Sequence, residues 1–182
     1  MSIKDWKQFT PFYFYSAVAL VLGVAAAQSE FSGRRILLLV FSGFLSWGLT
    51  EYILHRFVFH LGSHQILGRK LVYAPHQSHH ENPKATDPLF ASLLISVPIA
   101  SVYFLVARVA LGSWSAASYL FIGLIAGYFC YEWLHFQAHH RKPRLRIFRY
   151  LKRYHLLHHH RTPDSRFGVT SPVFDLLFGT FS

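Results

Sequence analysis

Long apolar stretches alternate with short polar ones along this chain. We expect four membrane spans, at residues 11–27, 36–57, 89–111 and 116–134. A transmembrane helix needs about 20 mostly apolar residues, and the four stretches lie near that length. The pattern predicts an all-α integral membrane protein with a four-helix transmembrane domain.

The polar segments between and after these stretches are expected to form a helical cap on one side of the membrane. This cap would comprise residues 55–87 and 135–182, and the whole chain, residues 1–182, would form a single domain. Asp87 and Pro88 suit the N-cap and first position of the third span, since proline at the first helical position loses no hydrogen bond. The basic N-terminus followed by the first apolar run is interpreted as a signal anchor that remains as the first span.

Ten of the 13 histidines fall into four boxes at the polar ends of these spans. The boxes are His55 and His60; His76, His79 and His80; His135 and His139; and His155, His158 and His159. A helix places positions i, i+3 and i+4 on one face, so each triplet is expected to aim its rings at one point. Neutral imidazole is the commonest protein metal ligand, and one ion takes four to six ligands. The boxes therefore predict a histidine-rich dimetal site.

Two glutamates precede box histidines by about one helical turn. Glu51 lies four residues before His55, and Glu132 lies three residues before His135. Either carboxylate could accept the second N–H of a ligand imidazole and orient its ring. Ligand type alone does not choose between Zn, Cu, Fe and Ni, all of which suit imidazole.

The composition supports a membrane protein and narrows the chemistry. Hydrophobic residues make up 52% and charged residues 14% of the chain, well below the ~25% charged content of soluble domains. A single cysteine, Cys130, excludes an internal disulfide and argues against an iron–sulfur cluster. The net charge of +10 does not indicate nucleic-acid binding, because basic residues beside membrane spans contact anionic lipid heads and set topology.

Topology follows from the distribution of lysine and arginine. With four spans, 15 of the 18 basic residues lie on the side that carries the histidine boxes, which the positive-inside rule makes cytoplasmic. The basic stretch after His140 shows apolar residues at three-to-four spacing, at Leu145, Phe148, Leu151 and Tyr154. It is interpreted as an amphipathic helix lying on the membrane surface.

The boxes resemble those of a known enzyme superfamily. His55-x4-His60, His76-x2-His79-His80, His135-x3-His139 and His155-x2-His158-His159 are similar to the four boxes of the membrane fatty acid hydroxylase and sterol desaturase superfamily. The tail Phe167-Gly168-Val169-Thr170-Ser171-Pro172, with Asp175 and Thr180 beyond it, resembles the segment after the last box. This tail and residues 150–155 look closest to fatty acid 2-hydroxylases.

The resemblance implies a di-iron monooxygenase that uses O2 and hydroxylates a fatty acyl chain. The expected reaction is 2-hydroxylation of a free or sphingolipid-linked fatty acid, with the ten box histidines as ligands of two iron ions and zinc as a substitute in purified protein. An external donor, of ferredoxin or cytochrome b5 type, would supply electrons. The basic residues Arg149, Lys152 and Arg153 offer a docking face for an acidic partner. The host membrane would be a bacterial inner membrane or the endoplasmic reticulum.

Three alternatives remain open from the sequence. One is a sterol or carotenoid hydroxylase or desaturase of the same superfamily, which only product analysis distinguishes. The second is a membrane haem electron carrier with bis-histidine ligation, although each haem group needs only one or two histidine ligands and not triplets. The third is a metal transporter, whose site would usually lie near the bilayer midplane and not at span ends.

Overall fold

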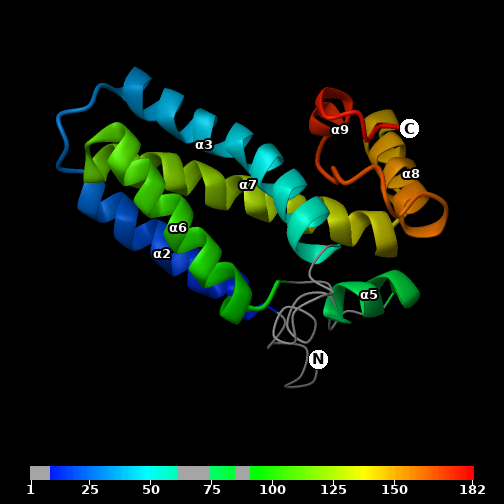
Figure 1. Cartoon of the computed structure of the whole chain (residues 1–182). Coiled ribbons are helices and arrows are strands. Elements are labelled where there is room, and N and C mark those ends of the chain that lie inside the picture. Colours follow the sequence, from blue (N-terminus) through cyan, green and yellow to red (C-terminus); the bar gives the residue numbers. More distant parts are fainter. Residues whose placement is uncertain (1–8, 61–73, 85–90) are drawn as a thin grey trace. The chain divides into compact units, whose positions relative to one another are not determined.

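The computed structural model describes residues 9–60, 74–84 and 91–182, and all the regular structure within them is helical (Figure 1). The helices are α2 (Thr10–Ala26), α3 (Gly33–Ile53), the π-helix η1 (Leu54–Phe59), α5 (Ala74–Glu81), α6 (Leu93–Leu111), α7 (Trp114–His140), α8 (Arg146–His160) and α9 (Val173–Leu177). The predicted all-α class is confirmed.

Three helical segments are long and apolar enough to cross a membrane. They are residues 33–59, which join α3 to η1, and the helices α6 and α7. Helix α2 is also apolar, but at 17 residues it is shorter, so the count of four spans stays a prediction. The Asp87-Pro88 cap lies outside the described residues; within them, Ser92 caps α6 by accepting a hydrogen bond from the Leu94 amide at 3.2 Å.

Contacts divide the chain into two compact units, and the predicted single domain stays a prediction. One unit comprises residues 1–47 and 90–129, and the other comprises residues 48–89 and 130–182. Helices α3 and α7 contribute to both, because α3 runs on to Ile53 and α7 runs on to His140.

In the first unit, α3 and α7 pack backbone against backbone at two glycines. A Cβ on Gly43 would lie 1.8 Å from the Leu120 carbonyl oxygen, and a Cβ on Gly123 would lie 1.9 Å from that of Val40. Small residues allow such close approach, which is how helices commonly associate within a bilayer. The Tyr119 hydroxyl donates to the Ala26 carbonyl at 3.0 Å and joins α2 to α7.

Large apolar side chains cover much of the outside of this unit. Leu20, Leu37 and Val109 are more than 60% exposed, and Val109 reaches 82%. Soluble proteins rarely expose contiguous apolar surface of this extent, whereas a lipid-facing surface requires it. The helices and their apolar exterior together identify a membrane protein.

The second unit is built around α8, whose apolar face packs against protein. Leu151 and Tyr154 are buried, and Phe148 meets Trp133 of α7 with ring centroids 5.3 Å apart. The Lys152 ammonium donates to the carbonyls of Ala138 at 2.5 Å and Arg141 at 2.9 Å, at the C-terminal end of α7. The expectation that this face lies on the membrane is therefore wrong: Phe148, Leu151 and Tyr154 pack inside the unit, and of the four apolar residues only Leu145 is exposed.

Candidate metal centre

The ten box histidines gather in the second unit as two groups of five. The first group is His55, His60, His76, His80 and His158, and the second is His79, His135, His139, His155 and His159. Within each group, the candidate ligand atoms all lie within 4.8 Å of one another. His140 and His160 belong to neither group, and His64 lies outside the described residues.

Each triplet is divided between the two groups, contrary to the expectation that its three rings aim at one point. On α5, His76 and His80 join the first group while His79 joins the second. On α8, His155 and His159 join the second group while His158 joins the first. Positions i and i+4 lie nearly in line along a helix, and position i+3 is offset around it, so one helix serves two neighbouring centres.

The first pair depends on an unusual helix. His55 lies in the π-helix η1, and His60 follows directly after its last residue, Phe59. Hydrogen bonding from i to i+5 brings residues five apart towards the same side, which an ordinary α-helix does not do. The ring centroids of His55 and His60 lie 5.1 Å apart, so both imidazoles reach one group.

The imidazole nitrogens are closer together than hydrogen bonding alone explains. The Nε2 atom of His155 lies 2.8 Å from that of His139 and 3.0 Å from that of His159. The Nε2 atom of His76 likewise lies 3.1 Å from those of both His60 and His80. An imidazole nitrogen carries one hydrogen or one lone pair, so it cannot make good hydrogen bonds to two others at once.

A metal ion fits this arrangement. Two nitrogens bound to one ion at about 2.1 Å and at right angles lie about 3.0 Å apart, the separation seen between these Nε2 atoms. Imidazole must be neutral to bind, and burial keeps several of the rings in that form. Burial lowers the pKa of His79 and of His80 to about 4, and that of His158 to about 3. The donor set and its protonation state therefore suit a metal.

Backbone carbonyls from the C-terminal segment orient two of the rings. The Nδ1 atom of His55 lies 2.6 Å from the Phe167 carbonyl oxygen, and that of His158 lies 2.7 Å from the Ser165 carbonyl oxygen. A carbonyl can only accept, so Nδ1 carries the proton and Nε2 presents its lone pair. Both Nε2 atoms are buried and have no hydrogen-bond partner among the described residues, as a metal ligand would.

Two buried carboxylates hold this segment in place. Asp175 accepts from the amides of Phe167 at 2.9 Å and Gly168 at 2.8 Å, and from the Thr180 hydroxyl at 2.7 Å. Glu51 accepts from the amides of Val169 and Thr170 and from the Thr170 hydroxyl. Carboxylate hydrogen bonds to amides are charge-assisted and strong.

The His55 N–H is taken by the Phe167 carbonyl and not by Glu51, whose contacts are with the same C-terminal segment, so an orienting role for Glu51 stays a prediction. Glu132 is 1% exposed in α7, and its proposed orienting role stays a prediction. Sequence reasoning assigned no role to Asp175, Phe167 or Ser165. The only sequence feature that pointed to this segment was the resemblance of the tail to a family segment. Backbone carbonyl acceptors cannot be recognised in a sequence, because every residue has one.

Comparison with known proteins places the chain in a family. The family model described as fatty acid hydroxylase matches residues 40–180. The dihydroceramide fatty acyl 2-hydroxylase FAH2 of Arabidopsis thaliana is 33% identical over 93% of this chain and 71% of its own length. The ceramide very long chain fatty acid hydroxylase SCS7 of Saccharomyces cerevisiae is 36% identical over 76% of this chain and 36% of its own length.

A solved structure agrees with these matches. The hydroxylase domain visible in the structure of full-length scs7p aligns with a TM-score of 0.82 at 30% identity, covering 96% of this chain and 66% of that one. The predicted family resemblance and the predicted enzyme class, a hydroxylase, are confirmed. The matched residues 40–180 include both histidine groups and the C-terminal segment, and the chain belongs to the fatty acid hydroxylase family.

Proposed function

We propose that this chain is an O2-dependent lipid monooxygenase that hydroxylates a fatty acyl chain at carbon 2, in a free or sphingolipid-linked fatty acid. Two groups of five neutral imidazoles, one fully and one partly buried, carry the proposal, because they are suited to a pair of metal ions and to little else. Relatives named dihydroceramide and fatty acid 2-hydroxylases support the substrate class and the position.

We assign one iron ion to each histidine group, with the ten box histidines as ligands. A redox-active metal supplies the oxidising power for attack on an unactivated C–H bond, which side chains lack. The protein holds the rings neutral by burial and fixes the Nδ1–H of His55 and His158 on backbone carbonyls. Zinc also suits imidazole, so a purified sample can carry zinc in place of iron.

We further propose that the chain spans the membrane four times, with α2 as the fourth span, and that the histidine groups face the cytoplasm. The excess of lysine and arginine on that side supports the orientation. In this arrangement the acyl chain enters from the bilayer, and a separate one-electron donor supplies electrons from the cytoplasm.

Lipid mass spectrometry on cells that express the wild type, His158→Ala or His140→Gln tests the function. His158 belongs to the first histidine group, whereas His140 is half-buried and belongs to neither group. We expect a 2-hydroxy acyl lipid to accumulate with the wild type and with His140→Gln, and to be absent with His158→Ala.

The identity of the product decides between related reactions. A product that has lost two hydrogens would show that the enzyme desaturates its substrate and does not hydroxylate it. An oxidised sterol or carotenoid would show that the substrate is not an acyl chain. The oxygenase proposal is refuted if wild-type cells form no product and if the protein purified from cells grown in iron-rich medium holds no iron.

A further inference from the structure

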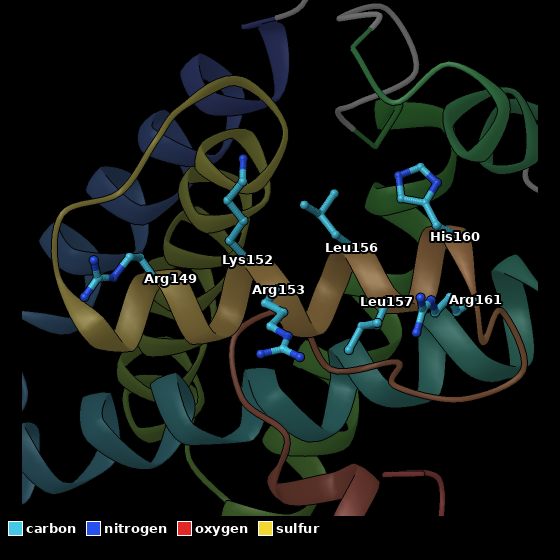
Figure 2. A pocket seen from close by; sticks show the side chains of 7 residues that line it. All are labelled: Arg149, Lys152, Arg153, Leu156, Leu157, His160 and Arg161. Carbon is cyan, nitrogen blue, oxygen red and sulfur yellow. The ribbon is translucent and has the colours of Figure 1, made fainter.

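Helix α8 has two faces with different chemistry. Its inner face carries His155, His158 and His159, all buried in the two histidine groups. Its outer face borders an open hollow of ≈ 530 Å³, shown in Figure 2 and called here the α8 groove. The groove is lined by Arg149, Lys152, Arg153, Leu156, Leu157, His160 and Arg161.

The α8 groove is strongly cationic, and no acidic side chain lines it. Between Glu132 and Asp164 the sequence contains eight lysines and arginines and not one aspartate or glutamate. Arg149, Arg153 and Arg161 are exposed, and Leu156 and Leu157 add apolar surface between them. A surface of this kind is complementary to an acidic partner that also presents a few apolar side chains.

We propose that the α8 groove is the docking site of an acidic one-electron donor protein. This rests on the proposed function, in which each turnover consumes one O2, two electrons and two protons. One oxygen atom enters the C–H bond to give a hydroxyl group, and the other leaves as water. Two donor molecules are each oxidised by one electron, so a donor must dock close to the metal centre twice per turnover.

The position of the groove supports this occupant over others. A helix with its side chains is about 10–12 Å across, and the groove and the three ligand histidines lie on opposite sides of the same helix. A protein bound in the groove therefore comes within about one helix diameter of both histidine groups.

A membrane surface is a poorer match for this face. A helix that binds a bilayer points a continuous apolar face at the lipid. In α8, Leu151 and Tyr154 of the apolar face are buried in the protein, and the groove presents only two leucines among its cations. Binding to anionic lipid is accordingly the competing outcome in the test.

The test compares two charge reversals of equal size. Arg149→Glu with Arg153→Glu alters the groove, whereas Arg34→Glu with Arg35→Glu alters exposed arginines of the first unit that do not line it. Iron-loaded protein in detergent is titrated with two acidic probes, a [2Fe–2S] ferredoxin and a soluble cytochrome b5 domain, at 0.15 M salt. At that ionic strength charges further apart than about 8 Å are largely screened, and neither control arginine adjoins Arg149 or Arg153 along α8.

We expect the groove variant to raise the Kd of at least one probe tenfold or more, and the control variant to change it less than threefold. The rate of reduction of the bound iron by that probe should fall in parallel, while iron content and reduction by dithionite stay unchanged. Equal loss in both variants would overturn the proposal, as would failure of the wild type to bind either probe. Selective loss of binding to phosphatidylserine vesicles, with donor binding intact, would assign the groove to lipid.

Binding and activity readouts separate the two proposals. If the wild type binds the donor through the groove but forms no hydroxylated lipid, the docking site stands and the proposed reaction fails. If lipid is hydroxylated equally well by wild type and groove variant at limiting donor, the docking site fails and the reaction stands.

Discussion

Replacement of Asp175 by asparagine is the sharpest test of how the C-terminal segment supports the metal centre. Asp175 is fully buried and accepts hydrogen bonds from two amides and one hydroxyl. Asparagine has nearly the same shape but replaces one acceptor oxygen by an NH2 group. That group would face the amide of Phe167 or of Gly168, so two donors would meet in a buried place.

The magnitude follows from the bonds that change. A hydrogen bond to a charged group contributes about 1.5–3 kcal/mol, and a buried donor left unsatisfied costs about 1–3 kcal/mol. Asparagine can keep the bonds on one side through its carbonyl oxygen, so we expect the free energy of unfolding to fall by about 2–4 kcal/mol. The displaced segment also carries the carbonyls of Phe167 and Ser165, which orient His55 and His158.

Two measurements check this prediction on purified protein in detergent. Thermal unfolding followed by tryptophan fluorescence should show a lower Tm for Asp175→Asn, and elemental analysis should show less iron per chain. Asp164→Asn removes an exposed carboxylate near the same segment and is the matched control. If Asp175→Asn unfolds like Asp164→Asn and retains full iron, the carboxylate does not support the site and the reasoning is refuted.

Three further predictions follow from other contacts. Gly123→Leu should destabilise the protein strongly, because its Cβ would overlap a backbone oxygen at 1.9 Å, while Gly33→Leu, with nothing within 4 Å, should leave the Tm nearly unchanged in the same thermal scan. Glu51→Gln combined with Asp175→Asn should cost less than the sum of the single changes, because both carboxylates anchor one segment; additive unfolding energies would contradict this. Finally, the pKa of His79 is lowered to about 4 by burial, so between about pH 6.5 and 4 the unfolded chain binds protons that the folded chain does not. The Tm of the metal-free protein should therefore fall as the pH drops through that range and should be constant above it, as measured by thermal scans at a series of pH values. A Tm that rises on acidification would show that the ring is protonated in the folded protein.

Much of the fold could be predicted because it depends on local properties. Span-length apolar runs predict helices without knowledge of their neighbours, and the runs at 36–57, 89–111 and 116–134 correspond to helical segments long and apolar enough to cross a membrane. The ends were less predictable. The span expected to end at residue 134 continues as α7 to His140, because the polar histidines that follow it are still helical.

The sequence by itself determined which residues take part in the candidate metal centre. Ten histidines in four boxes, distant along the chain, indicate a metal site from the sequence alone, and the structure brings all ten together in two groups. Spacing along one helix could not say how they divide, because that depends on which faces of α5, α7 and α8 meet. Only the tertiary structure decided that each triplet serves both groups.

The supports of the site were likewise a matter of tertiary structure alone. The partners of His55 and His158 are backbone carbonyls, which every residue possesses, so no residue type marks them in advance. Their positions depend on Asp175 and Glu51, which lie more than 120 residues apart and converge on one segment. The sequence determined the candidate ligands because imidazole chemistry resides in the side chain, and the tertiary structure decided their orientation because hydrogen bonds depend on distance in space.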